Sequence, residues 1–286
     1  RLTDVTGVQT CALPIWHNWR MTDLLADFDT DTLSYDGMVH RYYRLGSGPA
    51  VVVIAEIPGI TPKVIEFARR VVEAGCTVYV PSLFGVDGAG KKPSAMVKAL
   101  GTVCVSREFT VFATGKSSPV VLWLRELATR AHEECGGPGV GAVGMCVTGG
   151  FALALAVDDR MLAPVLSQPS LPVAITPGRR RTIDISPADL DIVQARCENG
   201  LQVLGTRFHC DQMSPSGRFA LLRNRLGTAF IGVELPGSTA NPNVPGPPHS
   251  VLTEHLIDEP GQPTRDALDQ VLAFFQQKLG VTTTGD

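Results

Sequence analysis

The feature that most constrains the fold is an alternation of short apolar runs with longer segments of helical spacing. The first run, residues 50–56 ("AVVVIAE"), is rich in β-branched side chains and predicts a strand buried on both faces. Residues 61–75 repeat apolar side chains at helical spacing, with Pro62 suited to a first turn and Gly75 to the helix end. Residues 76–82 predict a second strand. Strand, helix and strand in this order indicate a βαβ unit with parallel strands.

The same alternation continues to the end of the chain. Further strands are predicted at residues 140–145, 161–170, 201–208 and 228–237, and further helices at residues 118–137, 147–157, 186–200, 214–227 and 264–280. Residues 84–118 are irregular and predict a long connection that can cover a site. We therefore expect one α/β domain over residues 21–286, with a doubly wound, mostly parallel sheet flanked by helices.

The first twenty residues are left out of this expectation. Residues 5–15 ("VTGVQTCALPI") resemble the in-frame translation of a sequencing adapter. We interpret residues 1–20 as an artefactual extension and Met21 as the natural start; a disordered tail is the alternative.

The charge balance argues against nucleic acid and membranes as partners. A net charge of −3 gives no long-range attraction to nucleic acid or anionic lipid, because phosphate binding needs clustered Lys and Arg side chains. The one dense basic run, Arg179 to Arg181, is interpreted as a solvated loop, with anion binding as the alternative. No apolar run approaches the roughly 18 residues that span a bilayer. The seven cysteines include no C-x-x-C pair, which is typical of reduced thiols in a cytoplasmic protein. We expect a cytoplasmic monomer or small homo-oligomer, with no disulfide framework or structural zinc site.

Reactive side chains follow four of the predicted strands. Ligands of an open parallel sheet bind at the carboxyl ends of its strands, so these positions are the candidates for a site. The residues found there are Glu56, Cys146, Asp211 and, after a Pro/Gly/Asn-rich loop, His249.

Cys146 lies in a glycine-rich junction between a predicted strand and a predicted helix. Gly144 precedes it by two residues, and Gly149 and Gly150 follow it. A nucleophile elbow needs small neighbours at such a turn, and a helix N-terminus favours a thiolate. The chain order Cys146, Asp211, His249 is also the nucleophile, acid, histidine order of an α/β-hydrolase triad. Each residue has an alternative role: a buried cysteine, an aspartate that caps a turn, and an exposed loop histidine.

Four segments together resemble the dienelactone hydrolase family of α/β-hydrolases. They are "AEIPGI", "VGAVGMCVTGG", "RFHCDQMSP" and "PHSVLTEH", and the resemblance runs from about residue 50 to the C-terminus. It implies an α/β-hydrolase fold and hydrolysis of a small ester or lactone without a metal or organic cofactor. The implied site comprises the nucleophile Cys146, its triad partners Asp211 and His249, the carboxylate Glu56 that contacts the cysteine, and an oxyanion hole made by the N–H groups of Ile57 and Val147.

Two positions depart from the family pattern. Thr148 stands where the family elbow has a glycine, and Thr253 stands where better-known members have a substrate-binding arginine. Arg107 is a candidate replacement for that arginine, with a surface ion pair to Glu108 as its alternative, and Ser250 is a further candidate substrate contact. Competing functions are a thioesterase or other carboxylesterase, and a catalytically weak α/β-hydrolase that binds a small molecule.

Overall fold

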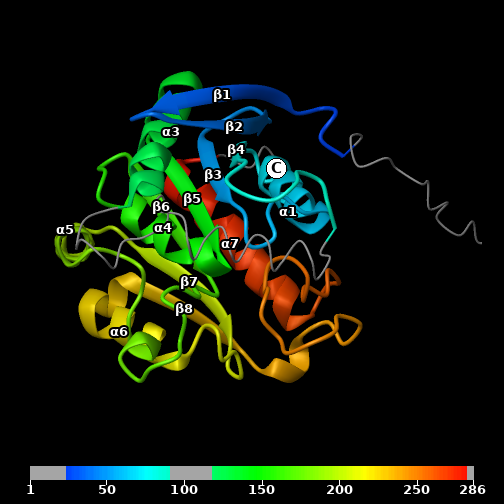
Figure 1. Ribbon diagram of the computed structural model, residues 1–286, viewed down its shortest axis with the longest axis vertical. Coiled ribbons are helices and arrows are strands. Elements are labelled where there is room, and N and C mark those ends of the chain that lie inside the picture. Colours follow the sequence, from blue (N-terminus) through cyan, green and yellow to red (C-terminus); the bar gives the residue numbers. More distant parts are fainter. Residues whose placement is uncertain (1–23, 91–117, 282–286) are drawn as a thin grey trace, which may run out of the picture.

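An eight-stranded sheet forms the centre of the computed structural model, which describes residues 24–90 and 118–281 (Figure 1). The strand order is β1-β2-β4-β3-β5-β6-β7-β8. The strands β3 to β8 run parallel, whereas β1 and β2 are antiparallel to their neighbours. The strands are β1 (Asp29–Tyr35), β2 (Met38–Leu45), β3 (Ala50–Ile54), β4 (Thr77–Pro81), β5 (Val140–Met145), β6 (Met161–Ser167), β7 (Val203–Phe208) and β8 (Phe230–Leu235). The predicted doubly wound, mostly parallel sheet is confirmed.

Helices cover both faces of the sheet and bury two separate apolar layers. The layer under α1 and α7 is packed by side chains such as Phe67 and Phe275, and the opposite layer lies under α3, α4, α5 and α6. The helices are α1 (Pro62–Glu73), α3 (Pro119–Cys135), α4 (Gly149–Leu155), α5 (Pro187–Glu198), α6 (Ser216–Leu226) and α7 (Pro263–Leu279), with short 3-10 turns at η3 (Cys146–Thr148), η4 (Arg179–Arg181), η5 (Gly227–Ala229) and η6 (Gly237–Thr239).

Strand β3 explains why its sequence is a continuous apolar run. Val51 and Val53 belong to the layer under α1 and α7, whereas Val52 and Ile54 belong to the opposite layer. Successive side chains point to opposite faces of a strand, so a strand with helices on both sides must be apolar at every position.

A hairpin precedes the parallel part of the sheet, in a segment whose sequence is polar and mixed. Strands β1 and β2 pair antiparallel in register from Asp29 opposite Arg44 to Tyr35 opposite Met38. Asp36 and Gly37 form the turn, with φ of 48° and 77°. Asp-Gly is the dipeptide that favours a two-residue hairpin turn with positive φ, so a sequence signal for this hairpin was present.

The helix caps follow the sequence only in part. The hydroxyl of Ser186 accepts from the N–H of Asp189 at 3.0 Å, and Pro187 occupies the first turn of α5. Ser118 stands at the N-cap of α3, but its hydroxyl makes no cap hydrogen bond.

Among the described residues, no helix is long and apolar enough to cross a bilayer, and all five described cysteines are free thiols.

Candidate active site

Cys146 lies at the sharp turn where β5 ends, as the first residue of the short turn η3. Its φ is 56°, a left-handed backbone conformation that a residue other than glycine adopts only under strain. A Cβ at Gly144 would lie 2.1 Å from the carbonyl oxygen of Thr148, and a Cβ at Gly149 would lie 2.7 Å from Pro169. These distances give the physical reason for the two glycines. The local geometry is that of a nucleophile elbow.

Thr148, which stands where the family elbow has a glycine, is completely buried. Its hydroxyl is hydrogen-bonded in this position. Its Oγ1 accepts from the N–H of Met145 at 2.9 Å. The same hydroxyl faces three carbonyl oxygens, among them that of Ile54 at 3.0 Å. The threonine therefore ties the elbow to the end of the neighbouring strand β3.

Asp211 and His249 form a buried pair beside the elbow. Asp211 follows β7 and His249 lies in the connection between β8 and α7, and the Oδ2 of Asp211 is 2.7 Å from the Nδ1 of His249. The other carboxylate oxygen, Oδ1, accepts from the N–H groups of Met213 at 2.9 Å and Ser214 at 3.1 Å. Both carboxylate oxygens of Asp211 thus have hydrogen-bond partners, and the aspartate holds the imidazole ring of His249 in one orientation.

The pKa of His249 is raised by its surroundings. Burial disfavours the imidazolium and by itself lowers this pKa, but the charges of Cys146 and Asp211 and the hydrogen bond to Asp211 outweigh it and raise the value to about 10. The imidazolium form of His249 is therefore favoured while its two partners are anionic.

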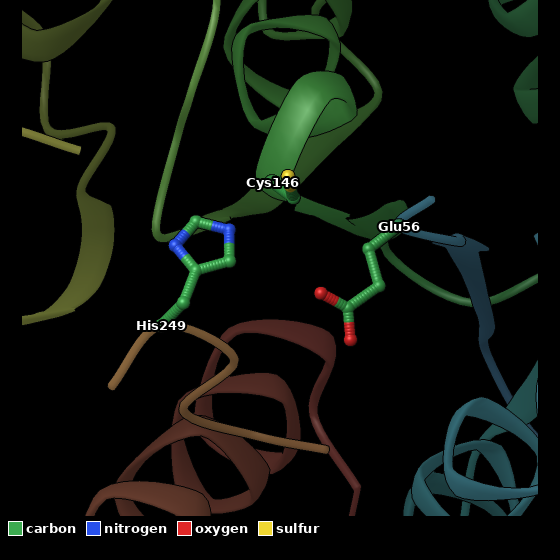
Figure 2. Close-up of side chains that lie close together, drawn as sticks. All are labelled: Glu56, Cys146 and His249. Atoms are coloured by element: carbon green, nitrogen blue, oxygen red, sulfur yellow. The ribbon is translucent and has the colours of Figure 1, made fainter. Parts of the chain in front are cut away.

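Glu56 reaches the same place from the end of β3, and Figure 2 shows it and His249 approaching Cys146 from two sides. One ligand atom of each of these three residues lies within 4.8 Å of the other two. The Glu56 side chain is 1% exposed. Its Oε2 accepts from the hydroxyl of Ser250 at 2.6 Å, and its Oε1 accepts from the hydroxyl of Thr253. The carboxylate is thus held by two hydroxyl groups of the histidine segment.

The other predicted site residues have mixed outcomes. Ile57 directly follows Glu56, and Val147 directly follows Cys146; neither N–H donates to a loop or turn carbonyl of the described residues. Their role in an oxyanion hole stays a prediction. Ser250 lies in the site, but its hydroxyl donates to Glu56. Arg107, the candidate for binding a substrate carboxylate, lies outside the described residues, as do residues 1–20.

A second histidine supports the first, and sequence reasoning missed it. The Nδ1 of His255 accepts from the N–H of Ser250 at 3.2 Å and from that of His249 at 3.4 Å. The N–H of His255 in turn donates to the carbonyl of Ser250 at 3.0 Å. Its ring packs edge-on against Phe208, with centroids 6.1 Å apart. The available signal was a second histidine within the segment "PHSVLTEH".

Arg218 was also missed, because nothing in the sequence marks an arginine of α6 as completely buried. Its guanidinium donates to the carbonyls of Pro169, Leu171 and Pro172. The loop held in this way includes Ser170, whose N–H donates to the carbonyl of Cys146 at 2.8 Å. Arg218 therefore fastens the loop that supports the elbow.

Comparison with known structures shows the fold. A protein assigned as a dienelactone hydrolase from Klebsiella pneumoniae subsp. pneumoniae superposes with a TM-score of 0.58 at 19% identity, covering 87% of this chain and 99% of that one. The 2,6-dihydroxy-pseudo-oxynicotine hydrolase gives 0.54 at 14% identity, covering 88% and 68%. A thioesterase domain from the curacin biosynthetic pathway gives 0.52 at 11% identity, covering 86% and 99%. The architecture is that of the α/β-hydrolases.

Comparison at the level of sequence identifies the family. No curated protein matches the chain significantly. The sequence pattern of the dienelactone hydrolase family matches residues 38–198, a segment that contains Glu56 and Cys146 and ends before Asp211 and His249. Because this segment is more than half of the chain, the protein belongs to the dienelactone hydrolase family.

Proposed function

We propose that this hydrolase cleaves small carboxylic esters or lactones through a triad of Cys146, His249 and Asp211. The observation that carries the proposal is the convergence of a strained cysteine elbow and a buried aspartate–histidine pair at one edge of the sheet. A thiol, a base and an orienting carboxylate in this arrangement are the components of nucleophilic acyl transfer.

The first half of the reaction forms an acyl-enzyme. The proton of the Cys146 thiol passes to His249, and the thiolate attacks the carbonyl carbon of the substrate. The N–H groups of Ile57 and Val147 stabilise the resulting oxyanion, an interaction worth about 3 to 4 kcal/mol per donor. When the intermediate collapses, the carbon–oxygen bond of the ester breaks and His249 returns its proton to the departing alkoxide. The product of this half is a thioester on Cys146.

The second half releases the acid. His249 accepts a proton from water, the hydroxide attacks the thioester carbonyl, and the thiolate leaves. The carboxylic acid departs, and the proton on His249 returns to the thiolate, which regenerates the Cys146 thiol and the neutral imidazole. The short Asp211–His249 contact supports both halves, since it keeps the same ring nitrogen directed at the reacting atoms.

The position of Thr253 bears on the substrate class. Its hydroxyl donates to Glu56, so this position contributes a neutral group and no cation. Two carboxylates, those of Glu56 and Asp211, are buried in the site. Since like charges repel strongly where water is excluded, we expect uncharged esters to react faster than esters that carry a carboxylate.

The decisive experiment compares the wild type with Cys146→Ala and Cys146→Ser on a panel of chromogenic esters, lactones and thioesters. We expect the wild type to hydrolyse short uncharged esters and both variants to lose this activity while keeping the wild-type melting temperature. Equal activity in Cys146→Ala would refute the proposal. A wild type that cleaves only thioesters would indicate the thioesterase alternative.

Thiol labelling separates an enzyme from a small-molecule binder. We expect iodoacetamide to modify Cys146 stoichiometrically at neutral pH and more slowly at acidic pH, because the thiolate is the reactive form of any cysteine. Exposed Cys210 serves as the internal reference for an ordinary thiol. Labelling of Cys146 no faster than Cys210, together with no turnover on any substrate, would favour a binder.

A further inference from the structure

We propose that Glu56, Cys146 and His249 form an inhibitory binding site for a thiophilic divalent cation, with Zn²⁺ as the preferred ion. The three residues offer one sulfur, one nitrogen and one oxygen ligand within 4.8 Å of one another (Figure 2). Thiolate, imidazole and carboxylate are the ligand types that zinc takes in proteins, and three of them leave a fourth position for water.

The distances fit a small adjustment of side chains. Zinc holds sulfur at about 2.3 Å and nitrogen or oxygen at about 2.0–2.2 Å, which places tetrahedral ligands about 3.5 Å apart. The present separations of up to 4.8 Å therefore have to shorten by about 1 Å. Rotation of the Cys146 and Glu56 side chains supplies such a movement without displacing the sheet.

The free ring nitrogen of His249 is a preorganised ligand. Its Nδ1 lies 2.7 Å from the Oδ2 of Asp211, whereas its Nε2 is buried and has no hydrogen-bond partner within residues 24–90 and 118–281. A histidine that ligates zinc through one nitrogen usually donates its other N–H to a carboxylate, which fixes the ring and strengthens the ligand. The pair required for general base catalysis is thus the same pair that supports a metal-bound histidine.

The carboxylate of Glu56 is oriented in a comparable way. Hydrogen bonds from Ser250 and Thr253 engage both of its oxygens and fix the plane of the group. Each carboxylate oxygen has two lone-pair positions, so one oxygen accepts a hydrogen bond and still ligates a cation. Its burial, with 1% of the residue exposed, makes compensation by a positive ion favourable.

The charges also balance. Zn²⁺ meets the anions of Cys146 and Glu56 and the neutral imidazole of His249, so the ion and its three direct ligands together carry no net charge. When the ion binds to the protein with a protonated thiol, the sulfur–hydrogen bond is replaced by a sulfur–zinc bond and one proton is released to solvent. No change of oxidation state is involved.

Bound zinc removes both reactive groups from catalysis. The Cys146 lone pair is directed to the metal, and the Nε2 of His249 cannot accept a proton. The binding of the ion does not depend on the proposed function, but its effect as an inhibitor rests on that function. A direct measurement of binding therefore stands apart from an assay of hydrolysis.

Cobalt(II) gives the direct measurement, since it occupies zinc sites and shows a thiolate-to-metal charge-transfer band. We expect titration of the reduced full chain with Co²⁺ to produce this band at one equivalent, and Zn²⁺ to displace the cobalt. Cys146→Ser should lose the band, whereas Cys210→Ser, which removes an exposed thiol, should keep it. Asp211→Asn should weaken Zn²⁺ binding at least about tenfold, because the second carboxylate no longer supports the ligand.

A second measurement needs no variant. Zn²⁺ should protect Cys146 of the wild type from iodoacetamide, as read by mass spectrometry of the labelled peptides, and a chelator should restore labelling. The metal-site proposal is overturned if the band survives in Cys146→Ser, or if Zn²⁺ neither displaces cobalt nor protects the thiol. An inactive wild type that still shows the band would refute the proposed function and leave the metal site standing.

Discussion

The hydroxyl of Thr148 lies 3.0 Å from the carbonyl oxygen of Ile54 and 2.9 Å from the backbone nitrogen of Met145. One side chain thus joins the cysteine elbow to the end of β3, which Glu56 follows by two residues. Its hydroxyl occupies the space that a glycine would leave, and the relative placement of nucleophile and carboxylate depends on this contact.

Replacing Thr148 by valine tests this contact. Valine keeps the shape but removes the hydroxyl that accepts from the N–H of Met145, and the loss of this buried hydrogen bond should cost about 1 to 3 kcal/mol of unfolding free energy. Thr148→Ser keeps the hydroxyl and should remain within about 1 kcal/mol of the wild type. Denaturant unfolding of the three proteins provides the measurement; equal stability of the valine and serine variants would contradict the expectation.

Asp211→Asn should abolish most of the turnover while preserving the fold. The N–H groups of Met213 and Ser214 require an acceptor at Oδ1, so the amide oxygen takes that position and the amide NH₂ faces His249. The amide then donates to Nδ1 and leaves the proton on Nε2, which is the wrong tautomer for a base. We expect kcat to fall by about 10⁴-fold, the loss measured for the same change in a serine triad.

The control for Asp211→Asn is the pH dependence of Cys146 alkylation. The charge of Asp211 and its hydrogen bond help to raise the pKa of His249 to about 10, and removing the charge should lower this pKa. An unchanged alkylation profile in an otherwise folded variant would show that the pair is not coupled to the thiol.

His255 is expected to act as a positioning residue for His249. His255→Phe retains the ring against Phe208 but removes the acceptor for two backbone N–H groups, whereas His255→Asn supplies an amide oxygen close to the original Nδ1 position. Misplacement of a catalytic group by about 1 Å can cost about 10²-fold in rate. We expect His255→Phe to lose up to about 10²-fold in kcat with KM little changed.

The asparagine variant separates positioning from general stability. His255→Asn should recover most of kcat, and both variants should melt cooperatively. If both variants lost kcat equally, or if the loss lay in KM alone, the role assigned to the Nδ1 acceptor would be wrong.

Asp184 provides a pH-dependent test of stability. Its carboxylate is buried beside Gly150, and neither oxygen is hydrogen-bonded to another residue that the structure describes; burial raises its pKa from 3.8 to about 7, opposed in part by the charge of Arg218. Between about pH 4 and pH 7 the folded protein therefore binds more protons at this site than the unfolded chain. The contribution of Asp184 to stability is fully present below pH 4, falls as the pH rises through this window, and stays level above it.

Asp184→Asn isolates this contribution, since asparagine resembles the protonated aspartate and does not titrate. The stability of the variant relative to the wild type should grow from pH 4 to pH 7, by on the order of 4 kcal/mol if the full shift is expressed. Denaturant unfolding at pH 4, 6 and 8 measures the difference, and a difference independent of pH would show that Asp184 ionises normally.

Much of the fold followed from the sequence because the parallel strands are buried on both faces. An uninterrupted β-branched run such as Val51 to Ile54 has few other uses in a globular protein. The hairpin before it was missed because β1 is exposed at all but one position, so no apolar pattern marks it. The one sequence signal for this hairpin was the Asp36–Gly37 dipeptide at its turn.

The candidate site was predictable where a residue lies in the segment that follows a strand, and not where contacts are made across the fold. Glu56, Cys146, Asp211 and His249 were found by their positions after strands. The acceptor role of His255 and the burial of Arg218 depend on loops whose paths no local pattern specifies. The sequence shows that Thr148 replaces a glycine of the family elbow. It does not show the hydrogen bonds of Thr148, because their partners include the end of the neighbouring strand β3.

The hydrogen bond between Ser250 and Glu56 spans 194 positions of the chain, and the one between His249 and Asp211 spans 38. During synthesis, Cys146 leaves the ribosome about a hundred residues before its base does. The Cys146 thiol therefore has no base to accept its proton until the segment around His249 has been synthesised and has packed against the sheet. The reactivity of this cysteine therefore depends on a late step of assembly, the docking of the segment around His249.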